Sequence, residues 1–263
     1  MTRLLRLLLV CVCAFAPQAR AVIITLNPSA DAFVTTGPTN DLIGNNYGGG
    51  GGLAVSAAGL PKGEFQSLAR FDVSSAVSSF NTTFGPGQWM IDGITLTLTA
   101  NPPNNAIFNG NGAGAGGSNV NFAGQFAIGW MQNDGWTEGI GTPAAPGASG
   151  ITFATLNSFL GAGDAALGTF GFGGATTGAD TWSLALAPAL TADVAVGGEV
   201  SFRFFAADTA VSYIFNSRSV ATVSSRPALN ISAVAVPEPG AATLLALGAV
   251  IVASRRLPHA RKT

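Results

Sequence analysis

The sequence contains one histidine, two cysteines and only 10% charged residues, and these scarcities exclude several kinds of chemistry. The histidine is His259, near the C-terminus, whereas Cys11 and Cys13 lie near the N-terminus. The long stretch between them has neither imidazole nor thiol. Catalysis by a Ser-His pair or a thiolate, and a zinc site built from His and Cys, are therefore excluded there.

The N-terminus has the three-part pattern of a secretory signal peptide. Arg3 and Arg6 give it positive charge, an apolar run follows, and Ala19 and Ala21 occupy the small-residue positions of the cleavage pattern. This pattern predicts a signal peptide over residues 1–21, whose removal would leave a mature chain without cysteine or disulfide. An uncleaved anchor is the alternative, but the run is short and a polar, strand-like stretch follows it.

The C-terminus is also organised in three parts. The motif Val236-Pro237-Glu238-Pro239 excludes helix and favours an extended, accessible segment. The uncharged run after it predicts a transmembrane helix over residues 240–254, shorter than the roughly twenty residues of a comfortable span. A basic tail at 255–263 begins with Arg255 and Arg256, which favour the cytoplasmic side and orient the rest of the chain outside.

This order of motif, short helix and arginine pair resembles the PEP-CTERM sorting signal, which would then occupy residues 236–263. The resemblance implies an exported protein of a Gram-negative bacterium, handled by an exosortase-type processing enzyme at the Pro-Glu-Pro triplet. It implies a precursor anchored transiently in the inner membrane, and a product at the cell surface or outside the cell. A plain hydrophobic tail anchor and a disordered end are the alternatives.

Between the two signals lies a body, residues 22–235, of a length that suits one domain with a sizeable core. It holds five Lys or Arg against twelve Asp or Glu, which gives a formal charge of −7. A sparse, acidic surface argues against nucleic acid as a partner. The abundance of Gly, Ala, Ser, Thr and Asn predicts a neutral, hydroxyl-rich surface that suits an extracellular matrix.

The body consists of short apolar or alternating segments separated by Gly, Asn and Pro turns. Residues 93–100 alternate most clearly, with Ile94, Leu96 and Leu98 on one face and threonines on the other. A short helix is expected at 152–160, and a Gly/Asn/Pro loop at 101–121. The fold class is therefore all-β, an antiparallel and jelly-roll-like β-sandwich. The expected strands are 22–26, 32–35, 53–56, 67–72, 93–100, 122–130, 182–186, 200–206, 211–215 and 227–235.

Several segments of the body resemble the DNRLRE domain family, in the family's order. They are Ala30-Asp31-Ala32-Phe33-Val34, Asn46-Tyr47-Gly48, Leu68-Ala69-Arg70-Phe71-Asp72, Asn133-Asp134-Gly135-Trp136-Thr137-Glu138-Gly139, Phe215-Asn216-Ser217-Arg218 and Arg226-Pro227-Ala228-Leu229. The resemblance implies a β-sandwich of secreted and surface proteins, similar to carbohydrate-binding modules. The chain departs from the family in its middle, where glycine-rich insertions replace a compact Trp-containing turn.

Two motifs could indicate enzymatic chemistry. Asp134 and Glu138 are the nearest pair of carboxylates that could support glycoside hydrolysis, although the segment reads more simply as a strand end with Trp136 in the core. Residues 112–117 match the glycine fingerprint of dinucleotide sites. That fingerprint requires a preceding strand and a following helix, and here Asn-rich loop surrounds it, which indicates a flexible loop.

Metal and ligand binding are open alternatives. No cofactor is expected, but a structural calcium is conceivable because Asp31, Asp41 and Asn45 offer oxygen ligands on expected loops. Trp130 and Trp136 are the residues proposed to bind a ligand, by stacking on sugar rings. A tryptophan at a strand position more often packs in the core.

Three arginines of the body, Arg70, Arg203 and Arg218, are expected within strands. They are predicted to pair with acids of the body such as Asp72 or Asp208, the alternative being contact with an acidic polysaccharide. Together these observations favour a non-catalytic surface or matrix protein. The alternative is a carbohydrate-binding module that recognises extracellular polysaccharide.

Overall fold

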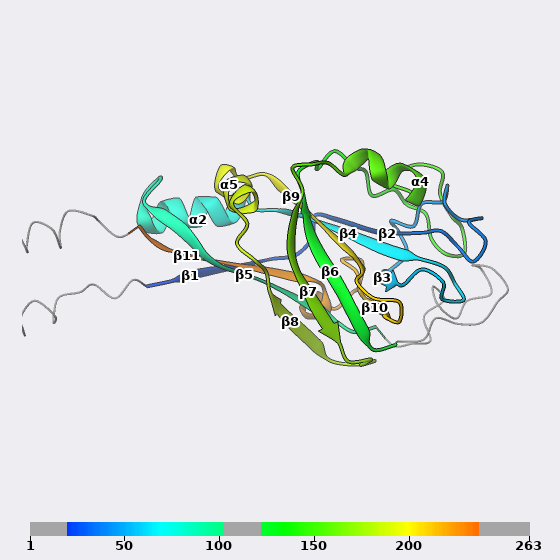
Figure 1. Cartoon of the computed structure of the whole chain (residues 1–263). Helices are drawn as coiled ribbons and strands as arrows, with labels where there is room; N and C mark the ends of the chain where they lie inside the picture. The colour runs from blue at the N-terminus through cyan, green and yellow to red at the C-terminus, as the bar shows by residue number, and fades with distance from the viewer. Residues whose placement is uncertain (1–19, 102–121, 237–263) are drawn as a thin grey trace, which may run out of the picture.

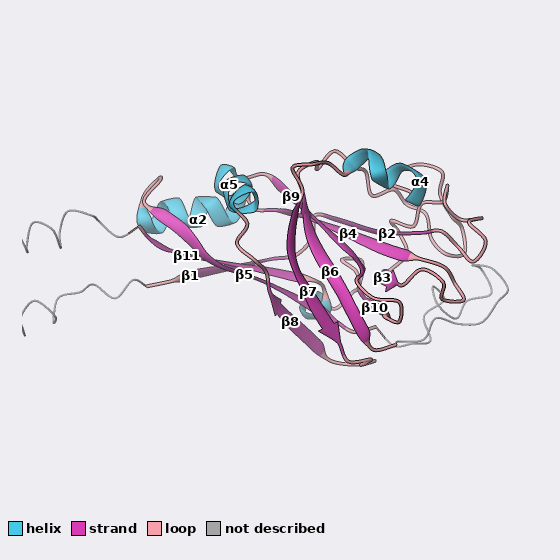
Figure 2. Ribbon diagram, viewed as in Figure 1, coloured by secondary structure: helices cyan, strands magenta, loops and turns pink. Residues whose placement is uncertain are grey.

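The computed structural model of the chain describes residues 20–101 and 122–236 (Figure 1). These residues form two sheets in which every strand pair is antiparallel (Figure 2). Buried side chains from both sheets share one core. The architecture is thus mostly β and is consistent with the predicted β-sandwich.

The first sheet has four strands in the order β1-β11-β5-β8. Ile94, Leu96 and Leu98 are buried and the threonines between them are half-buried, so the predicted alternation is confirmed. The strand predicted at 182–186 lies earlier than expected. The bounds are β1 (Val22–Leu26), β11 (Ala228–Ala235), β5 (Trp89–Thr99) and β8 (Ala179–Ser183).

The second sheet has seven strands, ordered β10-β3-β4-β9-β6-β7, with β2 also paired to β4. β7 was not predicted from the sequence, because its run of Ala and Gly gives a weak strand signal; its pairing with β6 holds it in place. The bounds are β2 (Ala30–Thr35), β3 (Gly52–Ser56), β4 (Phe65–Asp72), β6 (Gly124–Met131), β7 (Ala165–Phe172), β9 (Glu199–Ala206) and β10 (Ser212–Asn216).

Aromatic rings dominate the core between the sheets. Phe126 contacts Tyr213 at 5.0 Å and Trp182 at 5.2 Å between ring centroids, both edge-on, which joins one sheet to the other. Rings of this size bury the most apolar area per residue and favour such tilted contacts. The two sheets are therefore held together by specific ring contacts as well as by the burial of apolar area.

Two helices that the sequence did not predict complete the sandwich. In α2 (Ser74–Phe84), Ala76 and Phe80 are buried, and the helix ends at Gly85, where φ is 93°. In α5 (Pro188–Val196), Pro188 takes the first turn, and Leu190 and Val194 are buried. The Ser and Thr residues of α2 have modest helix propensity, so the helix depends on burial of one face rather than on its local sequence.

A third layer covers the outer face of the seven-stranded sheet. It contains the loop 132–151, then α4 (Phe153–Leu156) and the 3-10 turn η1 (Asn157–Phe159), which confirm the short helix predicted at 152–160. A second core forms beneath it from Leu68, Trp136, Ile151 and Leu156 with the small side chains of β2. A further 3-10 turn, η2 (Val223–Ser225), precedes β11.

Both ends of the described chain lie at the same end of the molecule, because β1 and β11 are neighbours and Val22 lies opposite Ala233 (Figure 1). No helix among residues 20–101 and 122–236 is long and apolar enough to cross a membrane. The predicted transmembrane helix at 240–254, most of the signal peptide and residues 102–121 of the predicted loop lie outside the described residues.

Candidate functional site

The segments that carry the DNRLRE resemblance meet on the outer face of the seven-stranded sheet. Asp31 comes from β2, Arg70 from β4, and Arg218 from the turn after β10. Each contacts the loop 132–151. Polar side chains far apart in sequence therefore form one cluster beneath that loop.

Arg218 and Glu138 form the centre of this cluster. The Arg218 Nε donates to Glu138 Oε1 at 2.8 Å, and a second guanidinium nitrogen contacts Oε2, so the pair is bidentate. The Arg218 backbone N–H donates to Asp31 Oδ2 at 2.6 Å, and the Asp31 N–H donates to Glu138 Oε1 at 3.3 Å. Burial raises the pKa of Asp31 to about 7, and the nearby Glu138 carboxylate adds to the rise.

Arg70 holds the other half of the loop. One of its terminal nitrogens donates to the carbonyls of Asp134 at 2.7 Å and Trp136 at 2.9 Å. Its guanidinium carbon lies 5.0 Å from the centre of the Trp136 ring, in the geometry of a cation–π contact. Its Nε is 3.5 Å from a carboxylate oxygen of Glu199.

Two of the three arginines therefore pair with acids, Arg70 with Glu199 and Arg218 with Glu138, and not with the acids that the sequence suggested. Arg218 lies in the turn after β10 and not in a strand as predicted. Asp72 accepts the Ser74 N–H, and Asp208 accepts the N–H groups of Gln125, Ala210 and Val211. Asp72 ends β4 and Asp208 follows β9, and each accepts from backbone two or three residues ahead, as short Asp side chains often do; Asp208 also accepts from Gln125 of β6. Arg203 donates instead to Gln66 Oε1 at 2.7 Å and lies over the Phe205 ring.

Asn46 joins two loops at this site and had no assigned role in the sequence analysis. Its buried amide donates to the carbonyls of Glu138 and Ile151, at 2.7 and 2.8 Å, and accepts the N–H groups of Gly48 and Gly141, both at 3.2 Å. All of the amide's roles are thus satisfied internally. Asn46 stands in a quoted segment of the resemblance, and that position was the only available signal.

The glycines that follow Asn46 allow this close approach. A Cβ on Gly48 would lie 2.0 Å from the Glu138 carbonyl oxygen, and one on Gly50 would lie 2.5 Å from the Phe33 ring. Tyr47 stacks on that ring with 4.7 Å between centroids. The glycine run is therefore a turn and also a segment that packs closely against the loop 132–151 and against Phe33.

An open cleft of about 690 Å³ borders the cluster. Hydroxyls of Ser29, Thr137 and Ser149 line it together with the charged groups of Arg70, Asp134 and Glu138. Ile140, also on its wall, is 85% exposed. The cleft can hold a polar ligand, because hydroxyls line it, while Arg70 and Glu138 on its wall already contact Glu199 and Arg218.

The carboxylates of Asp134 and Glu138 face different partners. Burial raises the pKa of Asp134, and its electrostatic neighbours include Ser201 and Asp193. Glu138 instead contacts Asp31 and Arg218, with Trp136 between the two acids in sequence. Trp136 belongs to the core, but the segment is loop and not the predicted strand end.

Trp130 and Trp136 do not present a ring face to solvent, so the predicted stacking role is corrected. Trp130 is 4% exposed and its Nε1 donates to Asp193 Oδ2 at 2.9 Å. Trp136 is 1% exposed and its Nε1 donates to Ser201 Oγ at 2.9 Å. In each residue the indole N–H donates to a side chain of the protein and the ring packs in a core, so burial leaves no polar group without a partner.

The three oxygen donors considered for calcium have other contacts. Asp31 accepts from Arg218, Asp41 accepts the Thr39 N–H at 3.4 Å, and the Asn45 amide donates to the Tyr47 hydroxyl. Within residues 20–101 and 122–236, no group of three or more His, Cys, Asp or Glu side chains could hold a metal ion. A calcium site stays a prediction.

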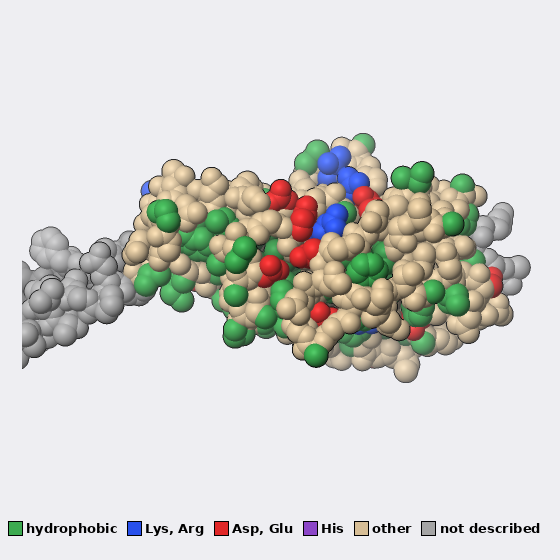
Figure 3. Space-filling view, turned by 90° about the horizontal axis from the view of Figure 1, so that it is seen from above, with side chains coloured by type: hydrophobic (Ala, Val, Ile, Leu, Met, Phe, Trp, Pro, Cys, Tyr) green, Lys and Arg blue, Asp and Glu red, His purple; other side chains and the backbone are tan. Residues whose placement is uncertain are grey.

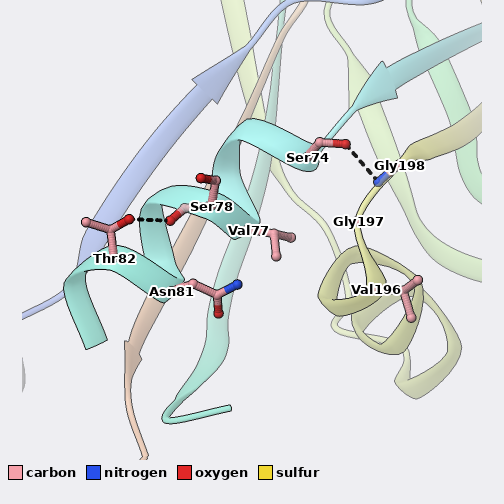
Figure 4. Close-up of a pocket in the computed structure, with 8 residues that line it drawn as sticks. All are labelled: Ser74, Val77, Ser78, Asn81, Thr82, Val196, Gly197 and Gly198. Atoms are coloured by element: carbon pink, nitrogen blue, oxygen red, sulfur yellow. Dashed lines mark hydrogen bonds between the residues drawn. The ribbon is translucent and has the colours of Figure 1, made fainter. Parts of the chain in front are cut away.

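A second hollow lies between α2 and the turn after α5, lined by Val77, Asn81, Val196 and nearby Ser, Thr and Gly residues (Figure 4). The Gly198 N–H donates to Ser74 Oγ at 3.2 Å and closes one side of it (Figure 4). No lining residue is titratable. The hollow can offer hydrogen bonds and apolar contact but no acid-base chemistry.

Only part of the predicted sorting apparatus can be placed. Val236 is 40% exposed, its N–H donates to the Gln88 carbonyl at 2.9 Å, and Ala21 is exposed. Pro237, Glu238, Pro239, Arg255, Arg256 and Ala19 lie outside the described residues.

The sequence matches no family model, and no curated protein matches it. The two family resemblances are therefore carried by the quoted residues alone.

Proposed function

We propose that this chain is an exported, non-catalytic surface or extracellular-matrix protein of a Gram-negative bacterium, sorted by an exosortase-type enzyme through its C-terminal signal. The observation that carries the proposal is the fit between the predicted signals and the domain ends. β1 begins at Val22 and β11 ends at Ala235. The motif thus starts at the exposed Val236, where an enzyme can reach it without unfolding the sheet.

The sandwich is of the jelly-roll type, and its strand order supports this assignment. The eight strands β1, β4, β5, β6, β7, β8, β9 and β11 can be numbered one to eight along the chain. The four-stranded sheet then reads 1-8-3-6 and the central part of the other sheet reads 2-7-4-5. This is the double Greek key of a jelly roll, an architecture frequent among lectin-like and capsid domains. β2, β3 and β10 are additions to that frame.

The non-catalytic assignment draws on the bonding of the polar cluster. Arg218 and Glu138 bond to each other, and one terminal nitrogen of Arg70 donates to two carbonyls of the loop 132–151. An active site instead needs groups aimed at the reacting atoms and left free for them. The contacts of the cluster hold the loop 132–151 against the sheet.

Replacing Pro237, Glu238 and Pro239 together with Ala tests the sorting proposal. Unprocessed precursor should accumulate in the inner membrane, measured by fractionation and by the mass of the chain. A variant with the body prolines Pro143 and Pro146 changed to Ala is the matched control and should mature normally. Normal maturation of the triple variant would refute the proposal.

Recognition of an extracellular polysaccharide is the second candidate function, and the cleft beside Glu138 favours it. This cleft is open and lined by hydroxyl groups, so it can accept a neutral glycan through hydrogen bonds. Among the residues described, Phe122 is the one large aromatic that is exposed, at 40%, so a binding mode based on an aromatic platform has little support.

A glycan array of the purified protein, run with calcium and with chelator, separates the two candidates. Saturable binding that weakens in Thr137→Ala and Ile140→Ala but not in Val223→Ala would establish the binding module. Val223 is 56% exposed and does not line the cleft, which makes it a suitable control. An array without binders would leave the matrix role.

A further inference from the structure

The end of the molecule where the described chain starts and stops carries no charged residue over three segments. This terminal end consists of residues 21–27, 73–91 and 228–236, which include β1, α2 and β11 and contain no Asp, Glu, Lys, Arg or His. Three exposed charged residues, Arg20, Asp72 and Asp92, border these segments in the sequence. The body nevertheless has a formal charge of −7. Figure 3 shows the charged side chains gathered mainly over the middle of the molecule.

Exposed apolar side chains occur at the same end. Ile23 is 63% exposed, Met90 49% and Val236 40%. Ile23 lies opposite Ser232 and Met90 opposite Val234, and the strand alternation points both outward from the four-stranded sheet. When exposed apolar side chains lie close together, they often mark an interaction surface.

The sequence that continues from this end limits its distance from a membrane. Residues 237–240 lead from Val236 into the apolar run, which begins at residue 240 and ends at residue 253. Four extended residues span at most about 14 Å. The polar layer on each side of a bilayer is roughly 5–8 Å thick, so an inserted run would bring the terminal end to the lipid headgroups.

We propose that the terminal end rests on the lipid surface while the precursor is anchored. This inference rests on the proposed function, because it requires the run at 240–253 to insert. The contact is made chiefly by apolar and hydrogen-bonding groups, and the charged residues that border it are of both signs, so it requires no anionic lipid and persists in salt. Among the acids of the body, Asp72 and Asp92 adjoin this end, Asp92 in β5 two residues from Met90. The loop 132–151 with α4 lies toward the opposite end (Figure 1).

The test places an environment-sensitive fluorophore at either end of the full-length chain reconstituted in phosphatidylcholine vesicles. Cys11 and Cys13 are replaced by Ser, and the label is attached through Met90→Cys or, as the control, Ile140→Cys. Lipids that carry a headgroup quencher report proximity, and flotation reports anchoring. The label at 90 should be quenched several-fold more than the label at 140, in low and in high salt. Adding Ile23→Asp should reduce quenching at 90 while the chain still floats.

Each other outcome counts against the contact. Equal quenching at both positions in chains that float would overturn the contact and leave the sorting proposal standing. A chain that does not float would overturn the anchored precursor and, with it, this contact. A label at 90 shielded from aqueous iodide even without vesicles would show that protein, such as a second copy, covers the end in place of lipid.

Discussion

Replacing Asp31 with Asn should remove the pH dependence of stability that this buried carboxyl imposes. Asp31 is 1% exposed, and burial raises its pKa from 3.8 to about 7 in the folded chain. Because the native state keeps the proton longer than the unfolded state does, the contribution of Asp31 to stability is greatest below pH 3.8. It falls as the pH rises towards 7.

The size of the effect follows from the same two values. A change from 3.8 to about 7 corresponds to a loss of about 4 kcal/mol between those pH values. Asn keeps an oxygen that can accept the Arg218 N–H and has no charge to desolvate. The free energy of unfolding of Asp31→Asn, relative to the wild type, should therefore rise by a few kcal/mol between pH 4 and pH 7.

Urea unfolding followed by tryptophan fluorescence at a series of pH values measures this difference. Asp72→Asn is the control of opposite sign, since hydrogen bonds from Ser74 lower the pKa of the exposed Asp72. The ionised Asp72 stabilises the wild type above the usual pKa of an Asp, and this contribution is lost as the pH falls below it. Asp72→Asn should lack this contribution at every pH. A constant difference between Asp31→Asn and the wild type across pH 4–7 would show that Asp31 is not held protonated by burial.

Two further changes test the interlocked loops. Asn46→Ala removes four hydrogen bonds and leaves the buried Glu138 and Ile151 carbonyls without that partner. It should lower the free energy of unfolding, measured in urea, by about 2–5 kcal/mol, whereas Asn45→Ala should change it little. Gly48→Ala should cost about 1–3 kcal/mol because its Cβ would meet the Glu138 carbonyl, whereas Gly44→Ala, with open space around it, should be nearly neutral. Equal stabilities within either pair would contradict the interlocking.

Local sequence determined most of the strands. The alternation at Ile94, Leu96 and Leu98 is a period-two pattern, and one buried face is enough to specify it, whereas β1 is indicated by its run of β-branched residues. The helix α2 and the strand β7 were missed because the Ser and Thr of α2 and the Ala and Gly of β7 have weak or contrary propensities, whereas the nine residues of α5 are too few to give a clear helical period. Neighbouring elements stabilise them through Phe80, Leu190 and Leu167.

The sequence also determined that the body lacks imidazole and thiol, and it supplied the signals predicted at both ends. Only the tertiary structure decided which polar residues meet. Glu138 and Arg218 are 80 residues apart, and Asn46 and Glu138 are 92 apart, so no local pattern could pair them. Tertiary packing also decided that Trp130 and Trp136 serve the cores, since exposure depends on what the other sheet and the loop 132–151 cover. The physical reason is that strand periodicity depends on neighbouring residues in the sequence, whereas burial and ion pairing arise between elements far apart in the chain.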